Sequence, residues 1–206
     1  MESISRRINI SIHSLVVCIL LVCFSCGNSS KTKNDHLVFR YNEHKNIGSL
    51  DPAFSKDIAD IWATHQLFNG LVQMDDQMKV LPCIANSWTI SDDALVYTFS
   101  LRKDVNFHKH QLFGKDSTRT VTAYDFEYSL NRLRDTQLAS PGSWVLQKVD
   151  DFKAINDSIF EIKLNQPFPA FLGLLTMKYC SVVPKEIVEH YGSDFRSNPI
   201  GTGPFQ

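Results

Sequence analysis

The sequence predicts a mixed α/β or α+β body that follows an export segment, and three observations lead to this expectation. Short apolar runs with a period of two alternate with runs that repeat every three to four residues, which indicates strands and helices in one body. A basic start and an apolar run come before this body, and a polar stretch separates them from it. Hydrophobic residues make up 43% of the 206 residues and aromatic residues 11%, as in globular rather than disordered chains.

The first 25 residues resemble a signal peptide. Arg6 and Arg7 form a short basic start, and an unbroken apolar run follows at 15–24. Ten apolar residues are too few to span a bilayer. Because the run ends just before Cys26, this segment resembles a lipoprotein signal, in which a peptidase cuts before a cysteine that carries lipid. We therefore expect a signal peptide at 1–25 and lipidation of Cys26, with plain secretion or an uncleaved anchor helix as the alternative.

The polar stretch at 26–36 contains no core-forming residue after its cysteine and predicts a flexible tether. Only Cys83 and Cys180 of the five cysteines belong to the body. An oxidising compartment permits a disulfide between them, but two cysteines so far apart in sequence are more often buried independently. Both alternatives remain open at this point.

The body opens with a predicted strand at 37–41, followed by a turn at Asp51-Pro52 and a helix from about 55 to 68. The apolar stripe of this helix consists of Ile58, Ile61, Trp62, His65 and Phe68. We expect the stripe to face the core, which makes His65 a core histidine rather than a ligand.

Alternating residues at 95–101 predict a half-buried strand, which pairs with 88–90 through the turn at 91–93. Residues 105–108 are expected to continue the meander. Further along, Thr122 begins a helix through a capping box with Asp125. The remaining predicted elements are strands at 160–164 and 182–183 and helices at 169–175 and 184–191, the last ended by Gly192.

No catalytic, metal or cofactor site is predicted. His108 and His110 lack the further ligands that a zinc or nickel ion needs, so a solvated loop is expected there. The glycines at 201 and 203 superficially suggest a phosphate loop, but no lysine follows them and Pro204 removes a donor. The formal charge of −1, without a basic stripe, excludes a nucleic-acid partner. The chain is therefore not expected to be an enzyme, and a metallohydrolase is the enzyme alternative.

Six short motifs, in order and spacing, resemble the oligopeptide, dipeptide and nickel solute-binding proteins of ABC transporters (family 5). They are S-L-D-P (49–52), L-F-N-G-L-V (67–72), V-L-P-C-I-A-N-S-W (80–88), Y-T-F-S-L-R-K-D-V-N-F-H (97–108), T-A-Y-D-F-E-Y-S-L-N-R (122–132) and N-P-I-G-T-G-P-F (198–205). The resemblance covers 37–206. Two departures stand out: a longer loop replaces the family's F-H-D-G turn after His108, and family members run to more than twice this length.

The resemblance implies the two-lobed periplasmic-binding-protein fold of type II, an α/β class, of which the chain carries only the first lobe and its extra subdomain. The incomplete first lobe would comprise 37–69 plus 184–206, and the family-specific subdomain 70–183. The second lobe would be absent, which makes the chain an N-terminal fragment.

The resemblance also implies an exported solute-binding lipoprotein at the periplasmic face of the cell envelope. It would capture peptides for an ABC transporter and have as partners a peptide or other small solute, the permease subunits, and the membrane through its lipid anchor. Alternatives are a nickel-chelate or other small-solute binding protein, a sensing or adhesion lipoprotein without a transporter, and a non-functional truncated fragment.

The resemblance further implies that two segments, 54–58 and 140–144, face the ligand. The ligand-facing residues would be Phe54, Lys56 and Ile58 in the first segment and Gly142, Ser143 and Trp144 in the second. Trp144 would offer a flat apolar surface, with a core tryptophan as the alternative.

Overall fold

The computed structural model describes Val38 and residues 40–206. Two compact units divide the chain, Met1–Asn42 and Glu43–Gln206. Every helix and strand of the described residues lies in the second unit. None of these helices has both the length and the apolar character that a membrane span needs.

Several sequence predictions concern residues outside those described. They are the signal peptide at 1–25, the lipidation of Cys26 and the tether at 26–36. The expected strand at 37–41 also includes two such residues, 37 and 39, and residues 40 and 41 form no strand.

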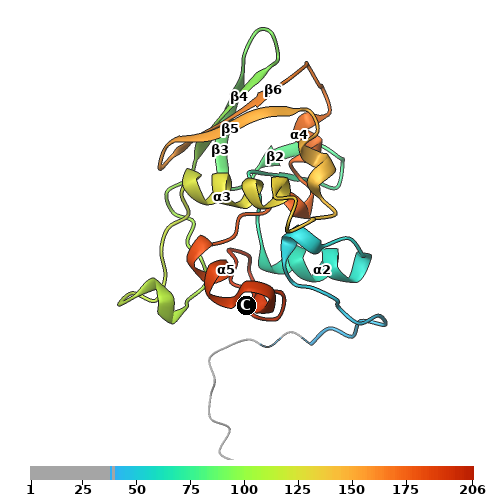
Figure 1. The fold of residues 1–206 in the computed structure, drawn as a ribbon, viewed down its shortest axis with the longest axis vertical. Helices are drawn as coiled ribbons and strands as arrows, with labels where there is room; N and C mark the ends of the chain where they lie inside the picture. The colour runs from blue at the N-terminus through green and yellow to red at the C-terminus, as the bar shows by residue number, and fades with distance from the viewer. Residues whose placement is uncertain (1–37, 39) are drawn as a thin grey trace, which may run out of the picture. The chain divides into compact units, whose positions relative to one another are not determined.

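A four-stranded antiparallel sheet forms the upper layer of the second unit (Figure 1). Its strands lie in the order β3 (Ala85–Ile90), β4 (Val96–Leu101), β6 (Ile159–Leu164) and β5 (Val149–Asn156). Tyr97, Phe99 and Leu101 are buried while their neighbours on β4 are half-buried, which confirms the predicted alternation. Phe99 pairs with Trp88 of β3 on one side and Phe160 of β6 on the other.

Helix α3 (Ala123–Arg134) lies against the sheet (Figure 1). Its buried apolar face consists of Phe126, Leu130 and Leu133. At its start, the Asp125 carboxylate accepts hydrogen bonds from the backbone N–H of Thr122 at 2.8 Å and from the Thr122 hydroxyl at 3.0 Å. The predicted capping box is therefore present.

A small ribbon and several short helical turns complete the main hydrophobic cluster. These elements are β1 (Val72–Met74), β2 (Val80–Pro82), η2 (Gln111–Phe113), η3 (Ser143–Leu146), α4 (Phe171–Leu174) and η4 (Lys178–Cys180). The Phe171 ring meets the Tyr97 ring edge-on, with centroids 5.0 Å apart, so α4 packs against β4.

A second hydrophobic cluster joins segments that lie far apart in sequence. Its elements are α2 (Ile58–Leu67), α5 (Lys185–Tyr191) and η5 (Gly192–Ser197), whereas η1 (Pro52–Phe54) packs into the main cluster through Ala53 and Phe54. Its fully buried members are Phe68, Val183, Ile187, Val188 and Phe195. Helix α5 follows Pro184 and stops at Gly192, where φ is +52°, as the sequence predicted. The division into a first lobe and a subdomain stays a prediction.

The glycines at 201 and 203 serve close packing. The backbone N–H groups of Thr202 and Gly203 both donate to the carbonyl oxygen of Leu67, at 3.0 and 2.8 Å. A side chain at Gly201 would overlap that same oxygen. The two glycines therefore allow the backbone at 201–203 to pack directly against the end of α2.

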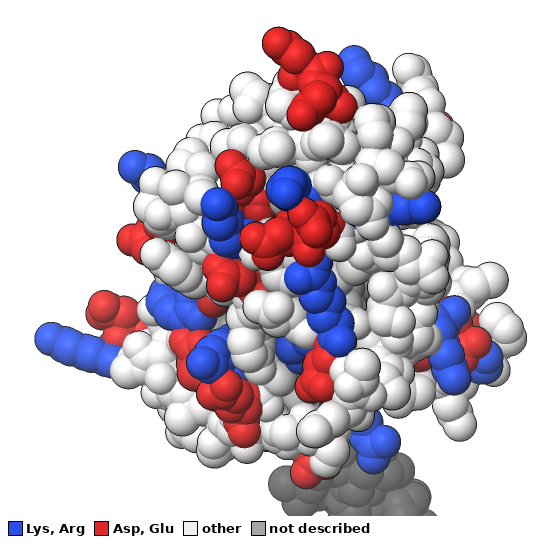
Figure 2. All heavy atoms as spheres, turned by 45° about the horizontal axis from the view of Figure 1, so that its top comes forward, with Lys and Arg blue, Asp and Glu red and all other residues white. Residues whose placement is uncertain are grey.

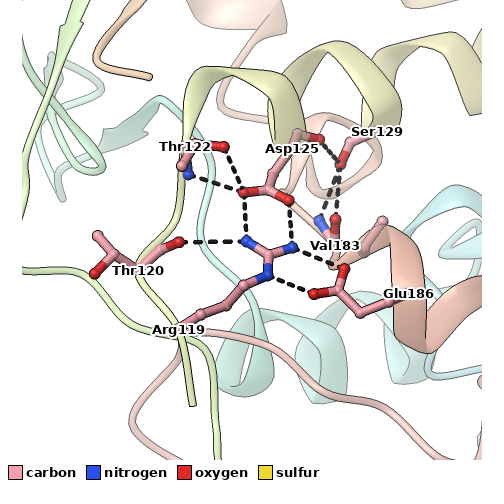
Figure 3. A network of polar contacts seen from close by, with 7 residues as sticks. All are labelled: Arg119, Thr120, Thr122, Asp125, Ser129, Val183 and Glu186. Carbon is pink, nitrogen blue, oxygen red and sulfur yellow. Dashed lines mark hydrogen bonds and ion pairs between the residues drawn. The ribbon is translucent and has the colours of Figure 1, made fainter. Parts of the chain in front are cut away.

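Arg119 links the starts of α3 and α5 (Figure 3). Its guanidinium donates to both oxygens of Asp125, at 2.8 and 2.7 Å, and to both oxygens of Glu186, at 2.5 and 2.8 Å. The guanidinium also lies 4.9 Å from the centroid of the Phe107 ring. One cation thereby holds two helix starts together, which connects the two hydrophobic clusters.

This network predicts a measurable pH dependence of stability. The hydrogen bond from Arg119 lowers the pKa of Glu186, so the carboxylate stabilises the fold above its unfolded pKa and loses this contribution as pH falls. Because Glu186 is partly exposed, we expect Glu186→Gln to cost about 0.5–1 kcal/mol at pH 7. In urea denaturation the difference between the two proteins should shrink toward zero below about pH 4. A difference that stays unchanged from pH 7 down to about pH 3 would contradict the assignment, because the contribution is lost as pH falls through the lowered pKa of the folded state.

The predicted core face of α2 is wrong for most of its length. Ile58 is 74% exposed and Trp62 is 59% exposed, while the buried positions are Ala59, Asp60 and Thr64. His65 is also exposed and is not a core histidine. Hydrogen bonds explain the reversal: Asp60 accepts from the N–H of Gly48, and Thr64 is bonded to Ser55. Of the predicted stripe only Phe68 is fully buried.

Two short predicted strands are also absent from the described residues. Asn106 forms only an isolated bridge with Thr120, so 105–108 does not extend the sheet. At 182–183 the N–H of Val182 donates to the carbonyl of Asn69, but no ladder follows. In both places the segment packs as extended chain without a strand partner.

Candidate functional site

A cavity of about 860 Å³ lies where the segments around η1, α3 and η5 meet. Its wall is largely apolar, with charged groups among the lining residues. The lining residues are Gly48, Ser49, Asp51, Phe54, Lys56, Asp57, Asp60, Arg132, Leu138, Ala139, Pro141, Gly192, Ser193 and Arg196. This volume is within the range of small-molecule sites.

Ser140 attaches one wall of the cavity to the other. Its buried hydroxyl donates to the carbonyl oxygen of Ala53 at 2.6 Å and accepts from the N–H of Gly142 at 3.0 Å. The preceding residue, Ala139, has φ of +50°, so this loop adopts a conformation that L-residues rarely use. The hydrogen bonds of Ser140 therefore fix the loop at 138–142 against η1.

An ion pair holds the turn before η1 to α3. The Arg132 guanidinium donates to both oxygens of Asp51, at 3.0 and 2.6 Å, and both side chains are nearly buried. Asp51 also accepts a hydrogen bond from the N–H of Ala53 at 3.0 Å. Because Asp51 and Arg132 both line the cavity, their pairing sets the position of its inner wall.

The structure brings together part of each predicted ligand-facing segment. Phe54 and Lys56 line the cavity, and Pro141 lines it from the second segment. Ile58 does not line it and projects from the exposed face of α2.

In the second segment Gly142 is buried, whereas Ser143 and Trp144 are exposed. Gly142 is buried beneath the ring of Tyr179, which a side chain at 142 would strike. Ser143 and Trp144 begin η3 and are both exposed, with Trp144 43% accessible. Trp144 is thus not a core tryptophan within the described residues.

The sequence did not single out Arg132, Arg196 or Tyr179. Burial, and secondarily the charge of Asp57, raises the pKa of the Tyr179 phenol, so Tyr179 lies near the start of α2 as well as on Gly142. In the sequence Arg132 is only the last residue of the motif at 122–132. Its partner lies 81 residues away, and no local pattern reveals such a contact.

Both body cysteines are free, as the independently buried alternative predicted. Burial raises the pKa of the Cys180 thiol to about 12, and burial also raises that of Cys83. Both thiols are therefore protonated at neutral pH and poorly suited to act as nucleophiles or metal ligands.

The predicted solvated loop at His108 and His110 is wrong. His108 accepts at Nδ1 from the N–H of Gly201, at 3.3 Å, and its Nε2 lies 2.7 Å from the carbonyl of Gly203. His110 Nε2 lies 3.1 Å from the hydroxyl of Tyr191 on α5. Both rings anchor the loop to distant segments. No group of three potential ligands that could hold a metal ion occurs in the part of the chain that the structure describes.

Surface charge is mixed around the body. Figure 2 shows Lys and Arg side chains interleaved with Asp and Glu across the face that it draws. Two ion pairs join the neighbouring strands β5 and β6, Lys163 with Asp150 at 2.8 Å and Lys153 with Glu161 at 3.4 Å.

Comparison with known proteins gives consistent matches. The family model described as bacterial extracellular solute-binding proteins, family 5 middle, matches residues 79–206. The glutathione-binding protein GsiB of Salmonella choleraesuis is 29% identical over 161 residues, which is 78% of this chain and 30% of GsiB.

Two solved structures share the fold. The periplasmic binding protein DppA from Helicobacter pylori, in complex with peptide STSA, is 31% identical with a TM-score of 0.68, over 77% of this chain and 34% of that chain. Haemophilus influenzae OppA in complex with RPPGFSPFR is 26% identical with a TM-score of 0.69, over 77% and 33%. The predicted fold class is confirmed, and the chain spans about a third of the length of these relatives.

Proposed function

Because the chain belongs to the bacterial extracellular solute-binding proteins of family 5, we propose that it captures peptides for an ABC importer. The observation that carries this proposal is the cavity at which Phe54 and Lys56 meet Pro141. Phe54 and Lys56 of the first predicted segment therefore lie around one hollow of suitable size with Pro141 of the second, while Gly142, Ser143 and Trp144 do not line it. DppA and OppA, each solved in complex with a peptide, are similar over 77% of this chain and support peptide as the solute.

The proposed role needs binding and no bond chemistry. In this proposal an extended peptide lies along the segment that starts at Phe54, bonded largely through its backbone as in strand addition. Trp144 supplies an exposed flat surface for a solute side chain. Solute contacts to a second lobe would favour the closed form, because closure is driven only by contacts that the open form lacks.

Trp144 does not line the cavity, and its replacement by alanine tests whether the second predicted segment contacts the solute. We expect Trp144→Ala to weaken binding of a tripeptide such as Ala-Ala-Leu by about tenfold in isothermal titration calorimetry, because a large aromatic contact is lost. The melting temperature should change little, since the side chain is partly exposed and begins a surface turn.

Trp62→Ala is the matched control. Trp62 is an equally large exposed side chain on α2, outside the two predicted ligand-facing segments, so its removal should leave peptide affinity unchanged. Equal effects of the two replacements, or none from Trp144→Ala, would argue against the proposed site.

We also propose that the protein works at the periplasmic face of the envelope, held by a lipid on Cys26 and docking on permease subunits. This rests on the sequence, since Cys26 lies outside the described residues. The intact mass of the protein extracted from membranes tests it: an unmodified Cys26 in the mature protein would exclude the anchor.

A further inference from the structure

The segment at 135–144 connects the end of α3 to η3 and has only two buried residues, Ser140 and Gly142. Before them, the N–H of Ala139 donates to the carbonyl oxygen of Asp135 at 3.1 Å, which continues the end of α3. After them, the chain enters the main hydrophobic cluster at 145–146. Two residues therefore decide how this segment lies on the body between its fixed ends.

The hydrogen bond of Ser140 lies directly behind the cavity wall. Its hydroxyl donates to the carbonyl oxygen of Ala53 at 2.6 Å, and the N–H of Ala53 in turn donates to Asp51 at 3.0 Å. Phe54 follows Ala53 in sequence and Pro141 follows Ser140, and both of these following residues line the cavity. One hydrogen bond therefore sets the spacing between the two predicted ligand-facing segments.

The backbone of this segment needs such an anchor. Ala139 has φ of +50°, a conformation that costs an L-residue energy and persists only where neighbouring contacts hold it. Around the hydroxyl, the N–H of Gly142 donates to the Ser140 side chain at 3.0 Å and the N–H of Ser143 donates to the Ser140 carbonyl at 3.2 Å. Without the hydroxyl, Ala139 can relax and the segment can leave η1.

We propose that Ser140 is a positioning residue for the solute. It is 4% exposed and does not line the cavity, so it acts through Phe54 and Pro141 and through the start of η3, where Trp144 lies. The inference rests on the proposed function and adds the residue that keeps its two segments in one arrangement. When fewer molecules hold that arrangement, the apparent affinity for solute falls by the same fraction.

Ser129 provides a matched control on the other side of α3 (Figure 3). It is also 4% exposed, and its hydroxyl donates to the carbonyl of Asp125 at 2.6 Å and accepts from the N–H of Val183 at 2.9 Å. It does not line the cavity. Alanine at either serine therefore removes one buried hydroxyl with two backbone partners, but only Ser140 stands behind the cavity wall.

Calorimetric titration with Ala-Ala-Leu, beside urea denaturation of each variant, separates positioning from stability. We expect Ser140→Ala to bind the tripeptide about three- to tenfold more weakly than the wild-type protein. Ser129→Ala should lose stability to a similar extent and keep the wild-type affinity. Ser140→Thr retains the hydroxyl and should also keep the affinity, even where the added methyl group lowers stability. Affinity then follows the hydroxyl at 140 and not the stability of the protein.

Hydrogen exchange followed by NMR gives a second readout that needs no solute. The N–H of Gly142 should exchange about tenfold faster in Ser140→Ala, because its acceptor is lost, and at the wild-type rate in Ser129→Ala. The N–H of Val183 should show the reverse pattern.

The outcomes distinguish this inference from the proposed function. Tripeptide binding that is equally tight in Ser140→Ala and the wild-type protein overturns the inference and leaves peptide capture standing. Equal loss of affinity in Ser140→Ala and Ser129→Ala also overturns it, since stability alone then explains the effect. Failure of the wild-type protein to bind the tripeptide overturns the proposed function and the inference with it.

Discussion

Replacement of Arg132 by alanine is expected to destabilise the fold by about 3–5 kcal/mol, because it leaves the nearly buried Asp51 carboxylate without a counter-charge. The loss is larger than that of a surface ion pair, since water reaches neither partner freely. The guanidinium also lies 5.8 Å from the centroid of the Phe195 ring, so some packing is lost with it. Urea denaturation followed by tryptophan fluorescence measures the change.

A second replacement separates charge from packing. In Arg132→Ala/Asp51→Asn the buried group is neutral and still accepts from the N–H of Ala53, so part of the lost stability should return. Lys153→Ala breaks an exposed pair and should cost less than about 1 kcal/mol. If Arg132→Ala costs no more than Lys153→Ala, the pair does not hold the cavity wall.

Alanine at Gly201 is expected to cost about 3 kcal/mol or to prevent folding. The new Cβ would overlap the carbonyl oxygen of Leu67 and the Phe68 ring, and backbone cannot move aside as a flexible side chain can. Circular dichroism during thermal unfolding gives the change.

The control for this prediction is Gly173→Ala. Gly173 lies in α4, and a Cβ there would have only the Met74 methyl group for a neighbour, at 4.0 Å. Alanine favours helix over glycine, so this variant should be neutral or up to about 1 kcal/mol more stable. A Gly201→Ala protein as stable as Gly173→Ala would mean that the contact with Leu67 is not maintained in solution.

Elements whose signals are local were predictable from the sequence. β4 was predicted from its alternation, α3 from its capping box, and α5 from Pro184 and Gly192 at its ends. Each of these signals acts within a few residues, so no knowledge of the tertiary structure is needed.

The orientation of α2 was not predictable in the same way. A periodic stripe indicates a helix, but which side is buried depends on what packs against it. Here Asp60 faces the body because it accepts a hydrogen bond from the N–H of Gly48, and Thr64 does so because it is bonded to the Ser55 hydroxyl. Trp62 faces outward. The cavity shows the same limit, since Lys56 and Arg196 both line it although they lie more than a hundred residues apart in sequence.

The second hydrophobic cluster has a consequence for the order in which the chain folds. The Thr202 hydroxyl bonds to the Asn69 side chain at 2.9 Å, across a separation of 133 residues. Such a contact closes a very long loop, and chains rich in distant contacts fold slowly. During synthesis Phe68 therefore lacks the ring of Phe195 until nearly all of 43–206 has been made. The second cluster is thus completed late, after the residues of the main cluster are already present.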